Sequence, residues 1–113
     1  MKNKLPEKSA SIQPLISQLK ELVSNHYKDR LKYMILYGSY ARGTFNPESD
    51  IDIMLVLNDM QSAYKEIDTL TELKTDLMLE NEIFISTNPT STEQFENSKQ
   101  LLYKNIKREG ILL

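Results

Sequence analysis

The feature that most constrains this chain is a composite motif in the segment LYGSYARGTFNPESDIDIMLVL, residues 36–57. A glycine–serine pair, Gly38 and Ser39, follows a short apolar run. Ten residues later come Asp50 and Asp52, which are followed by a second apolar run. A turn at the glycine and a strand at the acids would bring a backbone bend and two carboxylates into one small space.

The glycine–serine pair predicts a tight turn that can bind an anion. Gly38 permits a positive φ and has no side chain where a phosphate would approach the backbone. Ser39 adds a hydroxyl group beside free backbone N–H groups, and Arg42 can add a charge-assisted hydrogen bond. A Gly-Ser pair alone also fits an ordinary strand–helix turn, so its meaning depends on the acids that follow.

Asp50 and Asp52 predict a site for a divalent cation. Residues two apart on a strand point to the same face, and the rest of this strand is almost wholly apolar. Two like charges at the edge of a core are unfavourable unless a cation offsets them. Carboxylate pairs of this kind hold magnesium against the phosphates of a nucleotide. A lone Asp-x-Asp is usually a solvated surface pair, so the combination with the turn carries the prediction.

The spacing of apolar residues predicts an α+β fold, a two-layer arrangement in which a short sheet has helices packed mainly on one face. Helices are expected at about 11–28, 63–77 and 91–108, and strands at 31–37, 50–57 and 82–87. Asn88 and Pro89 are expected to end the third strand. Thr90 and Glu93 resemble a capping box for the last helix, and Gly110 is placed to stop it. Residues 1–10 are expected to be a loose lead-in.

Composition limits the classes of function. The length of 113 residues predicts a single domain, 1–113, with a modest core. No apolar stretch approaches the roughly 18 residues of a membrane helix, and the polar start predicts no signal peptide. A net charge of −2 lacks the basic excess of a protein that grips extended nucleic acid. With no cysteine, a cytoplasmic location is the default. We therefore expect a small ligand or a protein as partner.

The segment YGSYARGTFNPESDIDIMLV resembles the signature of the nucleotidyltransferase fold shared with DNA polymerase beta, in its minimal, single-domain (MNT) branch. That signature is Gly-Ser, ten residues and Asp-x-Asp, and it is matched at full spacing by Gly38, Ser39, Asp50 and Asp52. Four further residues agree with its usual form: Ala41, Arg42, Gly43 and Ser49. The resemblance implies a short mixed sheet within the α+β fold.

The resemblance also implies an activity. Such enzymes transfer a nucleoside monophosphate from a triphosphate to a hydroxyl group and release pyrophosphate. Gly38 and Ser39 would hold the triphosphate, while Asp50 and Asp52 would ligate two Mg²⁺ ions about 4 Å apart. Minimal members resemble the antitoxin half of pairs whose toxin is a HEPN-domain ribonuclease, and they move AMP from ATP onto a tyrosine of that toxin. We therefore expect a magnesium- and ATP-dependent protein adenylyltransferase that acts as such an antitoxin.

The third carboxylate of the family is the point at which the match is incomplete. Members active in transfer usually carry it, commonly as Asp, on a neighbouring strand, and the stretch 81–88 contains no Asp. Strand alternation would place Glu82 on the acidic face, so Glu82 is either the third catalytic carboxylate or a glutamate at the strand edge. An alternative function is a catalytically degenerate binding module that neutralises its partner by contact. A third option is transfer to a small molecule.

Overall fold

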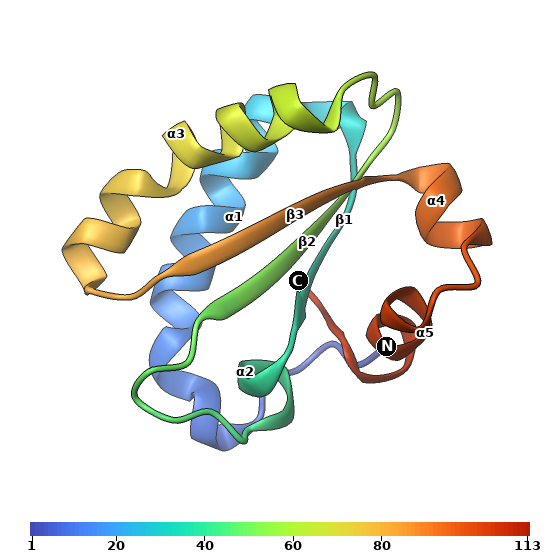
Figure 1. The fold of residues 1–113 in the computed structure, drawn as a ribbon. Helices are drawn as coiled ribbons and strands as arrows, with labels where there is room; N and C mark the ends of the chain where they lie inside the picture. The colour runs from blue at the N-terminus through green and yellow to red at the C-terminus, as the bar shows by residue number, and fades with distance from the viewer.

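The computed structural model describes residues 1–113 and contains a four-stranded mixed sheet (Figure 1). The strands are β1 (Leu31–Tyr37), β2 (Ile51–Leu57), β3 (Ile85–Ser91) and β4 (Ile111–Leu112). Their order is β3-β2-β1-β4; β1 runs antiparallel to β2 and β4, and β3 runs parallel to β2. The predicted α+β fold with a short mixed sheet is confirmed.

Two long helices, α1 (Gln13–Tyr27) and α3 (Ala63–Asn81), cover one face of this sheet (Figure 1). Pro14 lies in the first turn of α1, where its missing N–H costs no intrahelical hydrogen bond. Ser62 caps α3, since its hydroxyl accepts a hydrogen bond from the backbone N–H of Lys65. No helix here combines the length and the apolar surface that crossing a bilayer would need.

The opposite face of the sheet is covered in part by two short helices, α4 (Thr92–Asn97) and α5 (Leu101–Glu109). A second apolar cluster joins them to the strands: Ile35, Met54, Val56, Phe95, Tyr103 and Ile106. The single helix predicted at 91–108 is therefore wrong. Ser98 has an extended backbone that ends α4, and Ser91, rather than Thr90, caps that helix. Thr90 lies instead in β3, and its hydroxyl is 3.0 Å from that of Tyr103.

The predicted bounds of the third strand are also wrong. Glu82 is the C-cap of α3, with a left-handed backbone at φ 51°, and β3 starts three residues later. Asn88 and Pro89 do not end the strand, because β3 is an edge strand. An edge strand tolerates a proline, whose missing N–H can face away from the sheet.

The chain termini lie side by side and are ordered, contrary to the predicted loose lead-in. Lys2 bridges to Ile111, and the N–H of Leu112 donates to the Lys2 carbonyl at 2.7 Å. A 3-10 helix, η1 (Glu7–Ile12), follows, and within it the buried Ser9 hydroxyl donates to the Tyr40 carbonyl at 2.6 Å. The short strand β4 was not predicted. It begins directly after Gly110, which ends α5 as expected.

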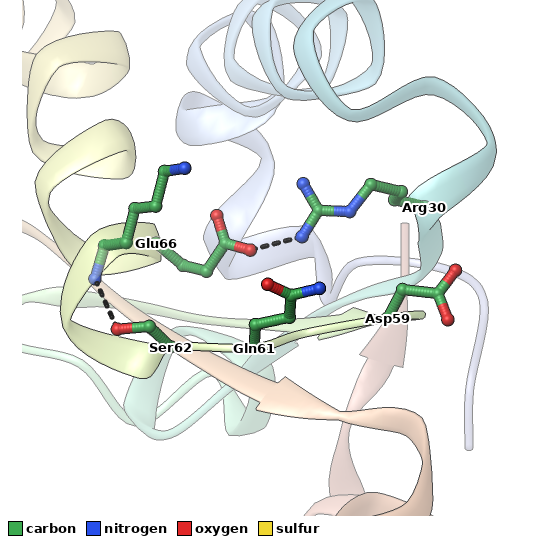
Figure 2. A pocket seen from close by; sticks show the side chains of 6 residues that line it. Arg30, Asp59, Gln61, Ser62 and Glu66 are labelled. Atoms are coloured by element: carbon green, nitrogen blue, oxygen red, sulfur yellow. Dashed lines mark hydrogen bonds and ion pairs between the residues drawn. The ribbon is translucent and has the colours of Figure 1, made fainter.

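A polar cavity of about 340 Å³ lies at the end of the sheet remote from the motif (Figure 2). Glu66, in the first turns of α3, is almost fully buried there and forms an ion pair with Arg30. The Tyr27 hydroxyl donates a hydrogen bond to the same carboxylate at 3.3 Å. Burial and the charge of Glu66 raise the pKa of Tyr27 well above its usual range. These groups join α1, the residue before β1 and α3, so we assign them to stability.

Replacing Arg30 tests this assignment. Arg30→Met would leave the Glu66 carboxylate buried without its cation, which typically costs about 3–5 kcal/mol. The Arg30 side chain is 40% exposed, so solvent screening reduces the expected loss in free energy of unfolding to about 1–3 kcal/mol. Urea denaturation measures the loss. The control Lys20→Met, on the exposed side of α1, should change little, and equal losses in the two variants would contradict the assignment.

Candidate active site

The composite motif forms the turn between β1 and the four-residue helix α2 (Ser39–Arg42), at one end of the sheet (Figure 1). Gly38 has φ +76°, a conformation that favours glycine, and it precedes α2 directly. The N–H groups of Ala41 and Arg42 both donate to the Gly38 carbonyl, at 3.1 and 3.2 Å. The N–H groups that open α2 have no partner within the helix, as at any helix start. The predicted turn is therefore present.

Asp52 lies directly against this turn. It pairs with Tyr37 across the antiparallel strands β1 and β2, one residue before the glycine. A Cβ atom at Gly38 would lie 2.3 Å from Oδ2 of Asp52, a distance that real Cβ atoms do not reach. Two constraints therefore require glycine at this position: its positive φ and the carboxylate beside it.

The charges around Asp52 are unbalanced. Burial and the negative charge of Asp50 raise the pKa of the Asp52 carboxyl group, whereas Arg42 lowers it. Neither of the two carboxylates takes part in an ion pair or accepts a side-chain hydrogen bond within the protein. Carboxylate oxygens are the ligands that Mg²⁺ prefers. Two mutually repelling, unpaired carboxylates therefore fit a divalent cation, although no third His, Cys, Asp or Glu joins them in a metal-binding group.

The strand beside Asp52 presents neutral groups. Ser86 of β3 is its register partner, and Asn88 follows two residues later on the same face. Burial and the Asp52 charge raise the pKa of the Tyr37 hydroxyl, while the Asn88 side chain lowers it. Strand alternation over the predicted strand at 82–87 already placed Ser86 on the acidic face. Asn88 shares that parity, but it was not included because the strand was predicted to end there, whereas β3 continues to Ser91.

Glu82 does not take the position predicted for it. It is exposed at the end of α3 and lies outside β3, so the strand alternation from which its catalytic role was predicted does not apply. The left-handed backbone at Glu82 reverses the chain between α3 and the strand. Ser86, rather than Glu82, is the β3 residue next to Asp52.

Arg42 and Ser39 lie at opposite ends of α2. Ser39 is at its start and partly exposed, beside the glycine turn. The exposed Arg42 guanidinium lies 3.9 Å from the Glu109 carboxylate of α5. Arg42, Glu109 and Gly38 line a small pocket between the turn and α5. No local sequence pattern predicts this pocket, because α5 is remote from the turn along the chain.

Two substitutions should move the pKa of Asp52 in opposite directions. Asp50→Asn removes a repelling charge and should lower it, whereas Arg42→Gln removes an attracting charge and should raise it. Carboxyl-carbon NMR titration measures both values. Because the folded-state pKa is raised, the folded protein loses stability as pH rises from the ordinary aspartate value through the raised one. Asp50→Asn should lessen that loss, and shifts of the same sign in both variants would contradict this electrostatic account.

The two glycines of positive φ provide a test of the Asp52 contact. Gly43→Ala places alanine in the left-handed αL region, at about 1–2 kcal/mol of unfolding free energy, and Gly38→Ala places it at ψ −156°, a region almost confined to glycine, at about 1–3 kcal/mol. A Cβ atom at Gly43 would meet its nearest neighbour, Cβ of Pro6, at 3.4 Å, an ordinary contact. Only Gly38→Ala displaces the Asp52 carboxylate, so only this variant should lose binding of Mg²⁺ or Mn²⁺ in a calorimetric titration. If Gly38→Ala still bound the cation, the turn would not be what positions the cation site.

Known proteins resemble this chain in sequence. The sequence model of the nucleotidyltransferase domain family matches residues 16–113. "Putative protein adenylyltransferase MJ0604" of Methanocaldococcus jannaschii is 33% identical over 87% of this chain and 93% of its own length. "Putative protein adenylyltransferase MJ0141" of the same organism is 35% identical over 64% of this chain and 72% of its own length.

Solved structures agree at the level of the fold. A crystal structure of a toxin–antitoxin with AMP-PNP matches 85% of this chain and 69% of its own, with a TM-score of 0.61 and 20% identity. A crystal structure of a "putative nucleotidyltransferase" from Sulfolobus solfataricus matches 95% of this chain and 86% of its own, with a TM-score of 0.56 and 16% identity. The chain therefore belongs to the nucleotidyltransferase domain family, in the minimal branch that its sequence resembles.

Proposed function

We propose that this chain moves AMP from ATP onto a hydroxyl group, that of a tyrosine, on a partner HEPN toxin, and so acts as an antitoxin in the cytoplasm. The observation that carries the proposal is the contact of the Asp52 carboxylate with the Gly38 turn, beside a second unpaired carboxylate. The names of the M. jannaschii relatives support a protein as the acceptor. The AMP-PNP of the toxin–antitoxin structure supports an adenine nucleotide as the donor.

Each group of the site has a role in this proposal. Asp50 and Asp52 would hold two Mg²⁺ ions. When bound, these ions would supply positive charge to the phosphates. Gly38 and Ser39 would hold the triphosphate through backbone N–H groups and a hydroxyl. Arg42 would leave its distant ion pair with Glu109 and add a charge-assisted contact to the phosphates.

The transfer itself needs no nucleophilic side chain. The acceptor oxygen forms a bond to the α-phosphorus of ATP, and the bond from that phosphorus to the bridging oxygen of the β-phosphate breaks. Pyrophosphate leaves with the electron pair, and the hydroxyl proton passes to water. The absence of cysteine from the chain is compatible with this chemistry.

A second candidate function is neutralisation of the partner by contact, with nucleotide bound but not consumed. The register position beside Asp52 favours it, because Ser86 offers no carboxylate there to accept the acceptor's proton. Glu82, the one acid predicted for that role, lies outside the strand. The two candidates differ in whether the partner is modified.

Incubation with α-phosphate-labelled ATP, Mg²⁺ and the protein encoded by the neighbouring gene, as the proposed toxin, tests the proposal. We expect label on a toxin tyrosine, and we expect Asp50→Asn and Asp52→Asn to reduce transfer by about 100-fold or more, as losses of charge-stabilising groups do. Glu82→Gln is the matched acidic control and should retain transfer. If the wild-type protein forms a complex with the toxin and neutralises it without labelling it, the transferase proposal is wrong and neutralisation by contact takes its place.

A further inference from the structure

The pocket between the glycine turn and α5 adjoins the candidate active site at Gly38. It measures about 150 Å³ and is lined from two segments far apart in the sequence, the end of β1 with α2 and the last helix α5. Gly38 belongs both to its wall and to the contact with Asp52. A ligand held at the turn would therefore reach into this α5 pocket.

The wall of the α5 pocket combines apolar surface with the side-chain NH₂ group of one asparagine. Leu102 lines it and remains 43% exposed, and Tyr37 and Ile106 add further apolar surface. The Asn105 carbonyl oxygen accepts a hydrogen bond from the Arg108 guanidinium at 3.0 Å. That bond leaves the Nδ2 hydrogens of Asn105 available to a ligand. An apolar surface beside an amide donor matches a flat heteroaromatic ring with nitrogen acceptors.

The charges of the pocket set the direction in which a triphosphate would lie. Glu109 lines the α5 pocket and would repel phosphate groups there. Arg42 also lines the pocket, 3.9 Å from this carboxylate, which offsets the Arg42 charge there. The phosphates are therefore expected at the turn and the uncharged end of the nucleotide in the pocket. Ligand pockets commonly measure about 300–1,000 Å³, so a pocket of about 150 Å³ suits one part of a nucleotide.

We propose that the α5 pocket binds the nucleoside part of the triphosphate, with Leu102 against the base and the Asn105 amide donating to a ring nitrogen. This inference rests on the proposed function and adds to it the residues that recognise the nucleotide beyond its phosphates. Neither residue contacts the reacting atoms, so both determine affinity and nucleotide choice.

Two probes that share a phosphate tail separate nucleoside binding from phosphate binding. One is α,β-methylene-ATP, whose α–β linkage resists cleavage, and the other is inorganic tripolyphosphate, which has no nucleoside. Calorimetry on the full chain with Mg²⁺ compares Leu102→Ala and Asn105→Ala with two neighbours on α5 outside the pocket, Leu101→Ala and Lys104→Ala. The leucine pair removes the same atoms from adjacent exposed positions, 43% and 71% exposed.

Each pocket variant should bind α,β-methylene-ATP about 5- to 20-fold more weakly than the wild type, the loss of affinity expected for one apolar contact or one hydrogen bond. Tripolyphosphate affinity should stay within about twofold, and both controls should match the wild type with either probe. Circular dichroism of each variant checks that α5 remains folded.

The other outcomes are distinguishable. Unchanged α,β-methylene-ATP affinity in both pocket variants would overturn this inference and leave the proposed transfer intact. An equal loss for tripolyphosphate would place the phosphates in the pocket and also overturn it. A wild-type protein that binds neither probe would remove the proposed function, and the nucleoside site with it.

Discussion

The close approach of the Asp52 carboxylate to Gly38 is the constraint on which the candidate active site depends. The antiparallel register of β1 and β2 places Asp52 opposite Tyr37, so the residue after Tyr37 must turn the chain without a side chain. A larger residue would displace either the turn or the carboxylate. The backbone turn proposed to bind phosphate and the acid proposed to bind the cation are therefore positioned by one contact beside the two central strands.

The two faces of the sheet differ in how completely helices cover them. One face carries the larger apolar cluster under α1 and α3, together with the Arg30–Glu66 ion pair at the far end of the sheet. The other face carries Asp52, with Ser86 as its neighbour on β3, and is only partly covered by α4 and α5. This partial cover leaves the site accessible and allows α5 to line it. The break between the two short helices makes this arrangement possible, because a single straight helix would not follow the turn of the chain.

Local signals in the sequence predicted the helices α1 and α3, the strands β1 and β2, and the turn between them. The glycine, the acids and the apolar alternation all act within about 20 residues of one another. The predictions that failed concern features that local sequence patterns do not report. The start of β3 was misplaced because Glu82 has a left-handed backbone, which apolar periodicity does not report. The α5 pocket and the pairing of Lys2 with Ile111 depend on contacts between distant segments, for which one sequence carries no pattern.

The central claim is that Asp50 and Asp52 bind a divalent cation beside the Gly38 turn. Paramagnetic Mn²⁺, added at substoichiometric amounts, broadens the NMR signals of the amides nearest to it and so reports the position of the ion. The account predicts that broadening begins at residues 38–39 and 50–52 and is abolished by Asp52→Asn. Broadening that begins at Asp59, in the polar cavity at the opposite end of the sheet, and that survives Asp52→Asn would contradict it.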